Sequence, residues 1–541
     1  MTVEPESDSP APSLTVAAVL RERVRDRGDH PLLICDSGRL GYAEADRRSA
    51  RLARGLITLG AGKGTHVGIL FPNDPAFVVA ALAVARIGAV AVPFSTFATA
   101  GELRQQLVDA DIRILLAASR FRSHDYVQRL GEIVAADRWA DGRPVLSGAT
   151  PQLRHIVIDH GDDGERGPAD AAGLPIGGVS EALLTAMEDD VAGSDPLAII
   201  YTSGSTSTPK GVVHTHAAQL GHQRNLNAIR GLSAEDRLFC NSPFCWIGGF
   251  GFALLATLLA GSTLICSNAA DDAVTLDLLE AEQPTITNGF AAGVAHLARH
   301  PSFAGRDLSS MRRGNLYPIM PADCRPADPE LRHNMLGMTE TGSVVLLDAD
   351  ETDQPEHRRG SFGKPAPGFE AKLVDPDTGA AVPTGETGEL CFRGPHLMQG
   401  YHKRGREDCF DPDGWFHTGD LARIDAEGFV YFLGRGGSMI KTAGANVSPA
   451  EVAKAIATVT GGAVAHVIGL PDPERGQVVA AAVVVADPSA FDAEKLRRRL
   501  RAELSAYKVP RKLVGLTAAQ VPLMSSGKID NRRLGEVFDS P

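Results

Sequence analysis

Apolar segments of alternating type follow one another between residues 66 and 117. Strand-like runs lie at His66–Phe71, Ala89–Val92 and Ile112–Ala117, and helix-like segments at Ala76–Ile87 and Glu102–Val108 separate them. Parallel strands need a crossover connection, and a helix is the usual one. This order therefore predicts consecutive βαβ units and an α/β fold class.

The sequence beyond residue 117 predicts that the chain folds into domains of unequal size. The run from Gly360 to Tyr401 is rich in Gly and Pro, which favours the short strands and turns of a β-rich subdomain. Adjacent glycines in Gly434–Ser438 can absorb a large backbone rotation. We expect a disordered leader over 1–13, a large domain over 14–434 and a small, mobile α+β domain over 435–541.

Composition narrows the class of protein. The chain has 541 residues, of which 43% are hydrophobic and 22% charged, as in ordinary soluble globular proteins. A formal net charge of -12 argues against nucleic acid or an anionic membrane surface as the main partner. The seven cysteines form no pair of closely spaced doublets, so neither a disulfide framework nor a zinc site is indicated. No long uncharged apolar stretch occurs, so we expect a cytoplasmic enzyme without integral membrane association.

A loop rich in hydroxyl residues follows the apolar run Leu197–Ile200 and ends at Lys210. Gly204 lets backbone amides approach an anion, hydroxyl groups can donate hydrogen bonds, and Lys210 supplies a positive charge. The pattern predicts a polyphosphate-binding loop. It is not a Walker P-loop, because Gly211 follows the lysine where Ser or Thr is required. The alternative is a solvated linker, which the flanking apolar segments, including Val212–Val213, disfavour.

With these features the chain resembles the adenylate-forming superfamily of acyl-CoA synthetases, luciferases and peptide-synthetase adenylation domains. The resemblance spans nearly the whole chain. It places the phosphate loop at Thr202–Gly211, the acidic metal and phosphate motif at Gly337–Glu340 and the ribose-binding segment at Gly414–Asp420. The loop of the thioester-forming tunnel resembles Lys441–Glu451, and the turn with the catalytic lysine resembles Ser525–Lys528.

The resemblance implies roles for individual residues. Lys528, Glu340 and Thr339 are the implied catalytic residues, with Glu340 holding Mg²⁺ and Thr339 contacting a nucleotide phosphate. Asp420 is the implied ribose anchor, and Arg435 also touches the ribose. The complete set implied for nucleotide and CoA binding is Thr202, Ser203, Gly204, Ser205, Thr206, Lys210, Asp420, Arg435, Lys441 and Gly444.

Three positions depart from the family pattern. Leu336 stands where a tyrosine commonly stacks on adenine, so we expect aliphatic packing there, with Tyr317 as a candidate for the missing aromatic face. Ser438 replaces the usual Asp or Lys of the hinge. Ser207 stands where the phosphate loop usually has glycine.

The acid-binding site is expected around Trp246, for which a core tryptophan is the alternative. Gly248, Gly249 and Gly289 are expected to leave space, which favours a bulky hydrophobic acid of long-chain, aryl or polycyclic type. No aspartate between Phe239 and Phe252 could pair with an α-ammonium group, which disfavours an amino acid.

Together these features predict an acyl-CoA synthetase that uses ATP and Mg²⁺, with coenzyme A as co-substrate. The expected partners are small molecules, without nucleic acid, and a long-chain acid would place the enzyme in lipid metabolism. A homodimer is compatible with the sequence, which does not decide the oligomeric state. Two alternatives stay open: an acyl-AMP ligase that loads a carrier protein, and a non-catalytic nucleotide-binding regulator.

Overall fold

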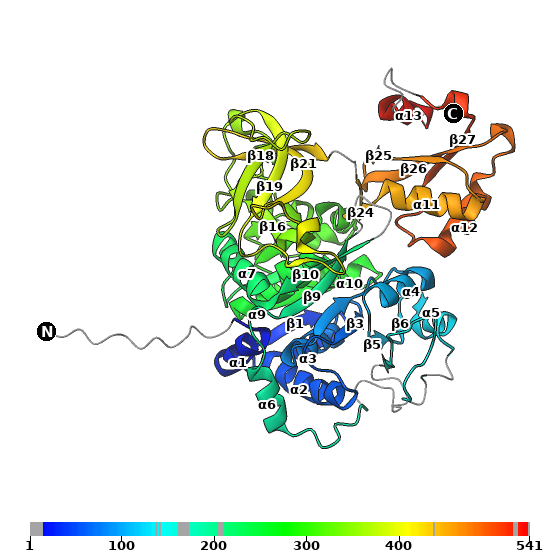
Figure 1. Cartoon of the computed structure of the whole chain (residues 1–541). Coiled ribbons are helices and arrows are strands. Elements are labelled where there is room, and N and C mark those ends of the chain that lie inside the picture. The colour runs from blue at the N-terminus through cyan, green and yellow to red at the C-terminus, as the bar shows by residue number, and fades with distance from the viewer. Residues whose placement is uncertain are drawn as a thin grey trace.

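The computed structural model describes residues 14–135, 139, 142–160, 173–202, 209–435, 439–522 and 529–538. Its helices and strands form a large lobe and a smaller lobe, coloured orange to red in Figure 1. The predicted leader, residues 1–13, lies outside the described residues.

The predicted βαβ units form the centre of a seven-stranded sheet in the large lobe. Its order is β20-β10-β9-β4-β3-β5-β8, and the five strands from β9 to β8 run parallel. The predicted α/β class is confirmed. The strands are β3 (His66–Leu70), β4 (Val90–Pro93), β5 (Ile114–Ala118), β8 (His155–Asp159), β9 (Pro196–Thr202), β10 (Lys210–Thr215) and β20 (Gly400–Tyr401), with helices α3 (Pro75–Arg86), α4 (Ala100–Asp109), α5 (Tyr126–Ile133) and α6 (Glu181–Asp189).

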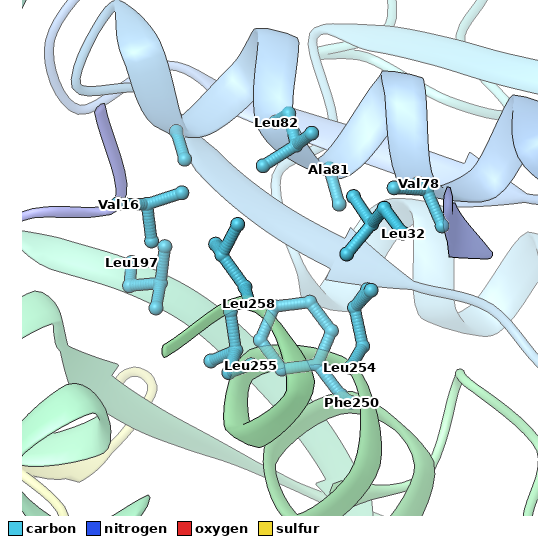
Figure 2. A pocket seen from close by; sticks show the side chains of 11 residues that line it. Val16, Leu32, Val78, Ala81, Leu82, Leu197, Phe250, Leu254, Leu255 and Leu258 are labelled. Carbon is cyan, nitrogen blue, oxygen red and sulfur yellow. The ribbon is translucent and has the colours of Figure 1, made fainter. Parts of the chain in front are cut away.

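Helix α3 is buried on every side from Phe77 to Arg86. A helix that is apolar all round belongs in a core, and Asp74 caps this one by accepting a hydrogen bond from the Phe77 N–H at 2.9 Å. A cavity of about 10 Å³ beside α3 is lined entirely by apolar side chains, as Figure 2 shows. It is too small and too apolar to hold a water molecule, so it is a dry packing defect.

A second sheet of six strands lies in the same lobe, in the order β14-β13-β11-β12-β1-β2. Helix α1 (Val16–Arg27) begins after Thr15, whose hydroxyl accepts a hydrogen bond from the Ala18 N–H. The strands are β1 (Pro31–Cys35), β2 (Gly38–Gly41), β11 (Arg237–Cys240), β12 (Thr263–Cys266), β13 (Ile286–Asn288) and β14 (Arg313–Gly314); the helices are α2 (Tyr42–Thr58), α7 (His216–Arg230), α8 (Ile247–Gly249), the π-helix η3 (Phe250–Leu255), α9 (Ala256–Ala260) and α10 (Asp272–Glu282).

Antiparallel strands complete the large lobe. One sheet has the order β18-β19-β21-β22 and another the order β15-β16-β17. The predicted β-rich run thus contributes to these sheets and, through β20, to the central one. The strands are β15 (Leu336–Met338), β16 (Ser343–Leu347), β17 (Lys364–Pro365), β18 (Glu370–Val374), β19 (Thr387–Arg393), β21 (Phe416–Ile424) and β22 (Val430–Arg435).

The small lobe is a five-stranded sheet with helices on both faces. Side chains alternate along β25, so Val467 packs with α11 and α12 on one face, and Ile468 and Leu470 pack with α13 on the other. No helix among the described residues of either lobe is long and apolar enough to cross a membrane. The elements are β23 (Ile440–Thr442), β24 (Ala445–Val447), α11 (Pro449–Thr460), β25 (Ala465–Asp472), β26 (Gly476–Val484), α12 (Ala493–Glu503), β27 (Lys512–Leu516) and α13 (Asn531–Val537).

Candidate active site

A cavity of about 1390 Å³ lies where the two lobes meet. It is large enough for a nucleotide and a second small molecule together. Of the residues singled out from the sequence, those that line it are Thr202, Lys210, Trp246, Gly248, Gly289, Leu336, Thr339, Glu340, Asp420, Lys441 and Gly444. The predicted residues Ser203, Gly204, Ser205, Thr206 and Lys528 lie outside the described residues, and so does the side chain of Arg435.

The acidic motif forms a short turn after β15 that side chains of other elements hold in place. The His214 ring contacts the carbonyl oxygen of Thr339 at 2.7 Å between Nε2 and O. From α7, His222 Nε2 lies 2.8 Å from the Val344 carbonyl, and the Gln223 amide donates to the Gly342 carbonyl at 3.0 Å. The core of the large lobe therefore fixes the position of Thr339 and Glu340.

Tyr401 connects two predicted site residues. Its hydroxyl donates a hydrogen bond to Glu340 Oε1 at 2.8 Å, and Lys210 Nζ lies 4.9 Å from the centre of its ring. The pairing of β20 with β10 brings Tyr401 there, opposite Val212. Sequence reasoning missed this residue, because the contact joins strands that are far apart in the chain.

Three histidines of β10 and α7 are buried in the neutral form. Burial lowers the pKa of His214 and of His216 to about 4, and that of His222 to about 3. All three are buried polar groups with hydrogen bonds to the backbone. His214 and His222 bond to the backbone at Thr339 and Val344, so the position of the acidic motif depends on these two rings remaining uncharged, whereas His216 accepts a hydrogen bond from the Val16 N–H at the start of α1.

These histidines predict a loss of stability in mild acid. Unfolded histidine binds a proton as the pH falls below about 6.5, whereas the folded histidines resist protonation until about pH 4. The free energy of unfolding is therefore expected to fall as the pH falls between these values, by several kcal/mol in total. Urea unfolding at steps from pH 7.5 to 4.5 measures this free energy. His222→Asn should make it depend less steeply on pH. Constant stability between pH 7 and 5 would contradict the prediction.

Asp420 lies on β21, where the residue is 5% exposed and lines the cavity. Glu389 holds the preceding residues of the same strand: its Oε1 accepts the Gly419 N–H at 2.8 Å, and its Oε2 lies 3.0 Å from His417 Nδ1. Cys391 stands beside this pair, and burial raises the pKa of its thiol to about 12. The hydrogen bond from the Gly419 N–H ties Glu389 to the residue next to Asp420, so we interpret the group as support for Asp420.

Aromatic residues form the wall around Trp246. The Phe290 ring lies edge-on to Trp246, with 5.9 Å between ring centroids, and both line the cavity. Phe290 was not singled out from the sequence, although it follows Gly289 directly. Tyr317 is absent from the residues that line the cavity and packs with Met320 and its neighbours, so it does not supply an aromatic face for adenine.

At Gly249 and Gly289, two of the three glycines predicted to leave space for the acid, any side chain would collide with neighbouring atoms. A Cβ on Gly249 would lie 2.2 Å from the Pro243 carbonyl oxygen, and Gly249 is not among the residues that line the cavity. A Cβ on Gly289 would lie 1.8 Å from Asn241 Oδ1. Both positions allow close packing of the chain. Gly248 and Gly289 both line the cavity, and a Cβ on Gly248 would be no closer than 3.5 Å to Ser242.

The hairpin of β23 and β24 carries the small lobe into the cavity. Gly444 lies at its turn with φ +86°, and a Cβ there would come within 2.4 Å of Phe290 Cγ. The backbone of Gly444 therefore packs directly on the Phe290 ring. Lys441, on the same hairpin, points its Nζ toward the Phe432 ring at 5.8 Å from the centroid.

Comparisons with known proteins identify the family. The AMP-binding enzyme family matches residues 20–402, and the AMP-binding enzyme C-terminal domain matches residues 451–528. The chain therefore belongs to the AMP-binding enzyme family. The predicted class, an acyl-CoA ligase, is confirmed by the curated relatives, which include synthetases and ligases of that kind.

Two relatives and one solved structure illustrate the similarity. The chain is 34% identical to a feruloyl-CoA synthase of Amycolatopsis sp, over 91% of this chain and 92% of that protein. It is 30% identical to a 7a-methyl-1,5-dioxo-octahydro-1H-inden-4-yl propanoyl:CoA ligase of Mycobacterium tuberculosis, over 97% and 99%. The o-succinylbenzoate CoA synthetase of Bacillus subtilis has the same fold, with a TM-score of 0.74, 24% identity and coverage of 96% and 98%.

Proposed function

We propose that the protein activates a hydrophobic carboxylic acid with ATP and transfers the acyl group to coenzyme A. The observation that carries the proposal is the single cavity that holds Asp420, Glu340 and Lys210 together with the aromatic wall and the small-lobe hairpin. Polar groups suited to a nucleotide thus lie beside an apolar site suited to the acid.

The donor set fits a magnesium nucleotide. The buried Asp420 carboxylate can accept hydrogen bonds from both ribose hydroxyls, and the Glu340 carboxylate is a hard oxygen ligand of the kind Mg²⁺ prefers. Mg²⁺ bound there would neutralise charge that develops on the phosphates. Lys210 lies at the start of β10, after the phosphate loop, where its ammonium group can contact the same phosphates.

In the first half-reaction, a carboxylate oxygen attacks the α-phosphorus of ATP. The bond from that phosphorus to the bridging oxygen of the β-phosphate breaks, and pyrophosphate leaves. Negative charge concentrates at the α-phosphate, so positive groups fixed there in advance stabilise the transition state. We assign this role to Lys528 and Lys210, with Thr339 as a phosphate contact.

In the second half-reaction, the thiol of coenzyme A attacks the acyl carbon, the thiol proton is released and the bond to AMP breaks. The hairpin with Lys441 and Gly444 reaches the aromatic wall in this structure, which supports a role as the wall of a thiol channel. We place the domain boundary at 434/435, next to Gly434, whose φ of +146° is a conformation that suits glycine.

The cavity wall favours an acid that carries a ring. Trp246 and Phe290 offer an edge-on aromatic pair, and Leu336 and Val344 add apolar surface. Both relatives compared above are named for ring-bearing acids, feruloyl and octahydro-indenyl propanoyl. We therefore propose an aryl or polycyclic acid ahead of a long-chain one.

An assay with ATP, Mg²⁺ and a panel of acids tests the proposal. Pyrophosphate release identifies the acid, and thioester formation after addition of coenzyme A or a carrier protein identifies the acceptor. Aryl and polycyclic acids are expected to release pyrophosphate faster than long-chain acids. Thioester on a carrier protein alone would favour the acyl-AMP ligase alternative, and no pyrophosphate with any acid would favour a regulator.

Gly444→Ala is expected to slow acyl transfer while adenylate formation continues. The new methyl group would collide with the Phe290 ring, so the hairpin must retreat. A displacement of about 1 Å can cost roughly a hundredfold in rate. Single-turnover transfer from preformed acyl-adenylate to coenzyme A measures the effect.

Gly461→Ala is the matched control for Gly444→Ala. Gly461 has a similar φ of +78° but no atom within 4 Å of a Cβ, so it reproduces the backbone strain without the collision. Equal effects of the two substitutions on acyl transfer would contradict the assignment of the hairpin.

A further inference from the structure

A buried ion pair joins the lobes at the edge of the cavity. Lys508, between α12 and β27 of the small lobe, donates from Nζ to Glu102 Oε1 on α4 of the large lobe at 2.7 Å. The same ammonium group donates to Glu451 Oε1 within its own lobe at 2.8 Å. The Ser505 hydroxyl donates to Glu102 Oε2 at 2.6 Å, so Glu102 receives two groups of the small lobe.

The charged groups of this contact are largely removed from solvent. The side chains of Lys508, Glu102 and Glu451 are 9%, 18% and 13% exposed. Burial alone would raise the pKa of Glu102, but the Lys508 charge and the hydrogen bonds hold it below its usual value. If the pair separates slightly, each charged group stays buried without its partner and without water. The contact therefore strongly disfavours small displacements of the small lobe relative to the large lobe.

The position of Glu102 is fixed before the small lobe docks. Glu102 is the third residue of α4, and its Oε2 accepts the Thr99 N–H at 2.9 Å while the Thr99 hydroxyl accepts the Glu102 N–H. This capping box holds the carboxylate in one orientation. Beside it, the Tyr507 ring lies edge-on to Phe97 of the large lobe, at 6.3 Å between centroids.

The contact selects one face of the small lobe. Helices α11 and α12 lie on the face of the small-lobe sheet toward α4, whereas α13 lies on the other face, away from α4 and α5 (Figure 1). Ile529, which follows Lys528 in the chain, packs with Leu534 on that outer face. The docking of Lys508 on Glu102 thus belongs to the arrangement that presents Gly444 to the acyl site.

We propose that Glu102 and Lys508 are positioning residues for acyl transfer, because their ion pair fixes the small lobe where the Gly444 hairpin meets Phe290. This inference rests on the proposed two-step function. The pair acts on the second half-reaction, since it holds the lobe in the arrangement in which Gly444 packs on Phe290.

Glu102→Gln tests the role with little change to the fold. Glutamine preserves the capping box, so α4 stays intact, but the charge that holds Lys508 is lost. Transfer from preformed acyl-adenylate to coenzyme A should slow about tenfold or more, in the usual range of coupling between sites. Pyrophosphate release in the first half-reaction should stay within about twofold of the unmodified enzyme.

A second interlobe ion pair supplies the matched control. Arg299 of the large lobe and Glu474 of the small lobe lie 3.4 Å apart, with 60% and 64% of their side chains exposed. Such an exposed pair contributes little, so Arg299→Gln should leave both half-reactions unchanged. Lys508→Gln should slow transfer as Glu102→Gln does, and the double variant should be no slower than either single one.

Three results would overturn the positioning role. If Glu102→Gln leaves the rate of acyl transfer unchanged, Glu102 has no positioning role. If it slows both half-reactions equally, Glu102 serves only to stabilise the fold of the large lobe. A raised KM for coenzyme A with an unchanged maximal rate would make Lys508 a direct contact of coenzyme A.

A structural readout separates this inference from the proposed function. Spin labels at the exposed positions Arg104 on α4 and Arg498 on α12 report the lobe arrangement without any reaction. Glu102→Gln should broaden their distance distribution and Arg299→Gln should not. If no acid gives a thioester but Glu102→Gln broadens the distance distribution, the proposed function fails while the ion pair still sets the lobe position. If Glu102→Gln leaves the distance distribution unchanged, that result alone overturns the inference.

Discussion

Lys528→Ala is expected to stop acyl-adenylate formation without unfolding the protein. The ammonium group is assigned to the negative charge that develops as pyrophosphate leaves, and removal of one such preorganised donor typically costs about a hundred- to a thousandfold in rate. Acid-dependent pyrophosphate release measures the loss. Transfer from preformed acyl-adenylate to coenzyme A should persist, because we assign that step to the hairpin with Gly444, which packs on Phe290.

Lys454→Ala is the control for Lys528→Ala. Lys454 is an exposed lysine on α11 of the same lobe, so its removal changes the net charge equally without touching the cavity. Unchanged adenylate formation in Lys528→Ala, or the same loss in Lys454→Ala, would refute the assigned role and with it the two-step proposal.

Glu340→Gln should have the second largest effect, again on adenylate formation. The substitution keeps the shape and the Tyr401 hydrogen bond but removes the charge proposed to hold Mg²⁺. We expect a loss of about a hundredfold or more, partly reversed at high Mg²⁺ concentration. Calorimetry should show weakened binding of Mg²⁺·ATP, with less change for ATP in the absence of the metal.

Two further variants make the Glu340 experiment specific. Tyr401→Phe removes only the hydroxyl that orients the carboxylate, so a smaller loss is expected. Glu386→Gln removes an exposed carboxylate from the β-rich part of the large lobe and should change nothing. Identical binding of Mg²⁺·ATP by Glu340→Gln and the unmodified protein would exclude Glu340 as the metal ligand.

Local patterns predicted the elements that surround the site. The apolar runs at β3, β4 and β5 and the uniformly apolar α3 appear where periodicity placed them, because each reflects the burial of its own residues. The caps of α1 and α11 that the structure shows are also local contacts, since the hydroxyls of Thr15 and Ser448 each accept from an amide three residues on.

Contacts between distant residues could not be predicted in this way. Nothing in the local sequence indicates that a side chain at Gly249 would collide with the Pro243 carbonyl, or that one at Gly289 would collide with Asn241. Tyr401 meets Glu340 only because β20 pairs with β10. These contacts depend on which surfaces the fold brings together.

The sequence by itself determined the α/β class, the order of the elements and the residue types that a nucleotide and an acid require, since these follow from short-range periodicity and from motifs. Only the tertiary structure decided that Phe290 would face Trp246 and receive Gly444, and that Lys508 would reach Glu102, 406 residues earlier in the chain. The physical reason is that burial and hydrogen bonding act through space, and the packing of two separate lobes is encoded in no single segment.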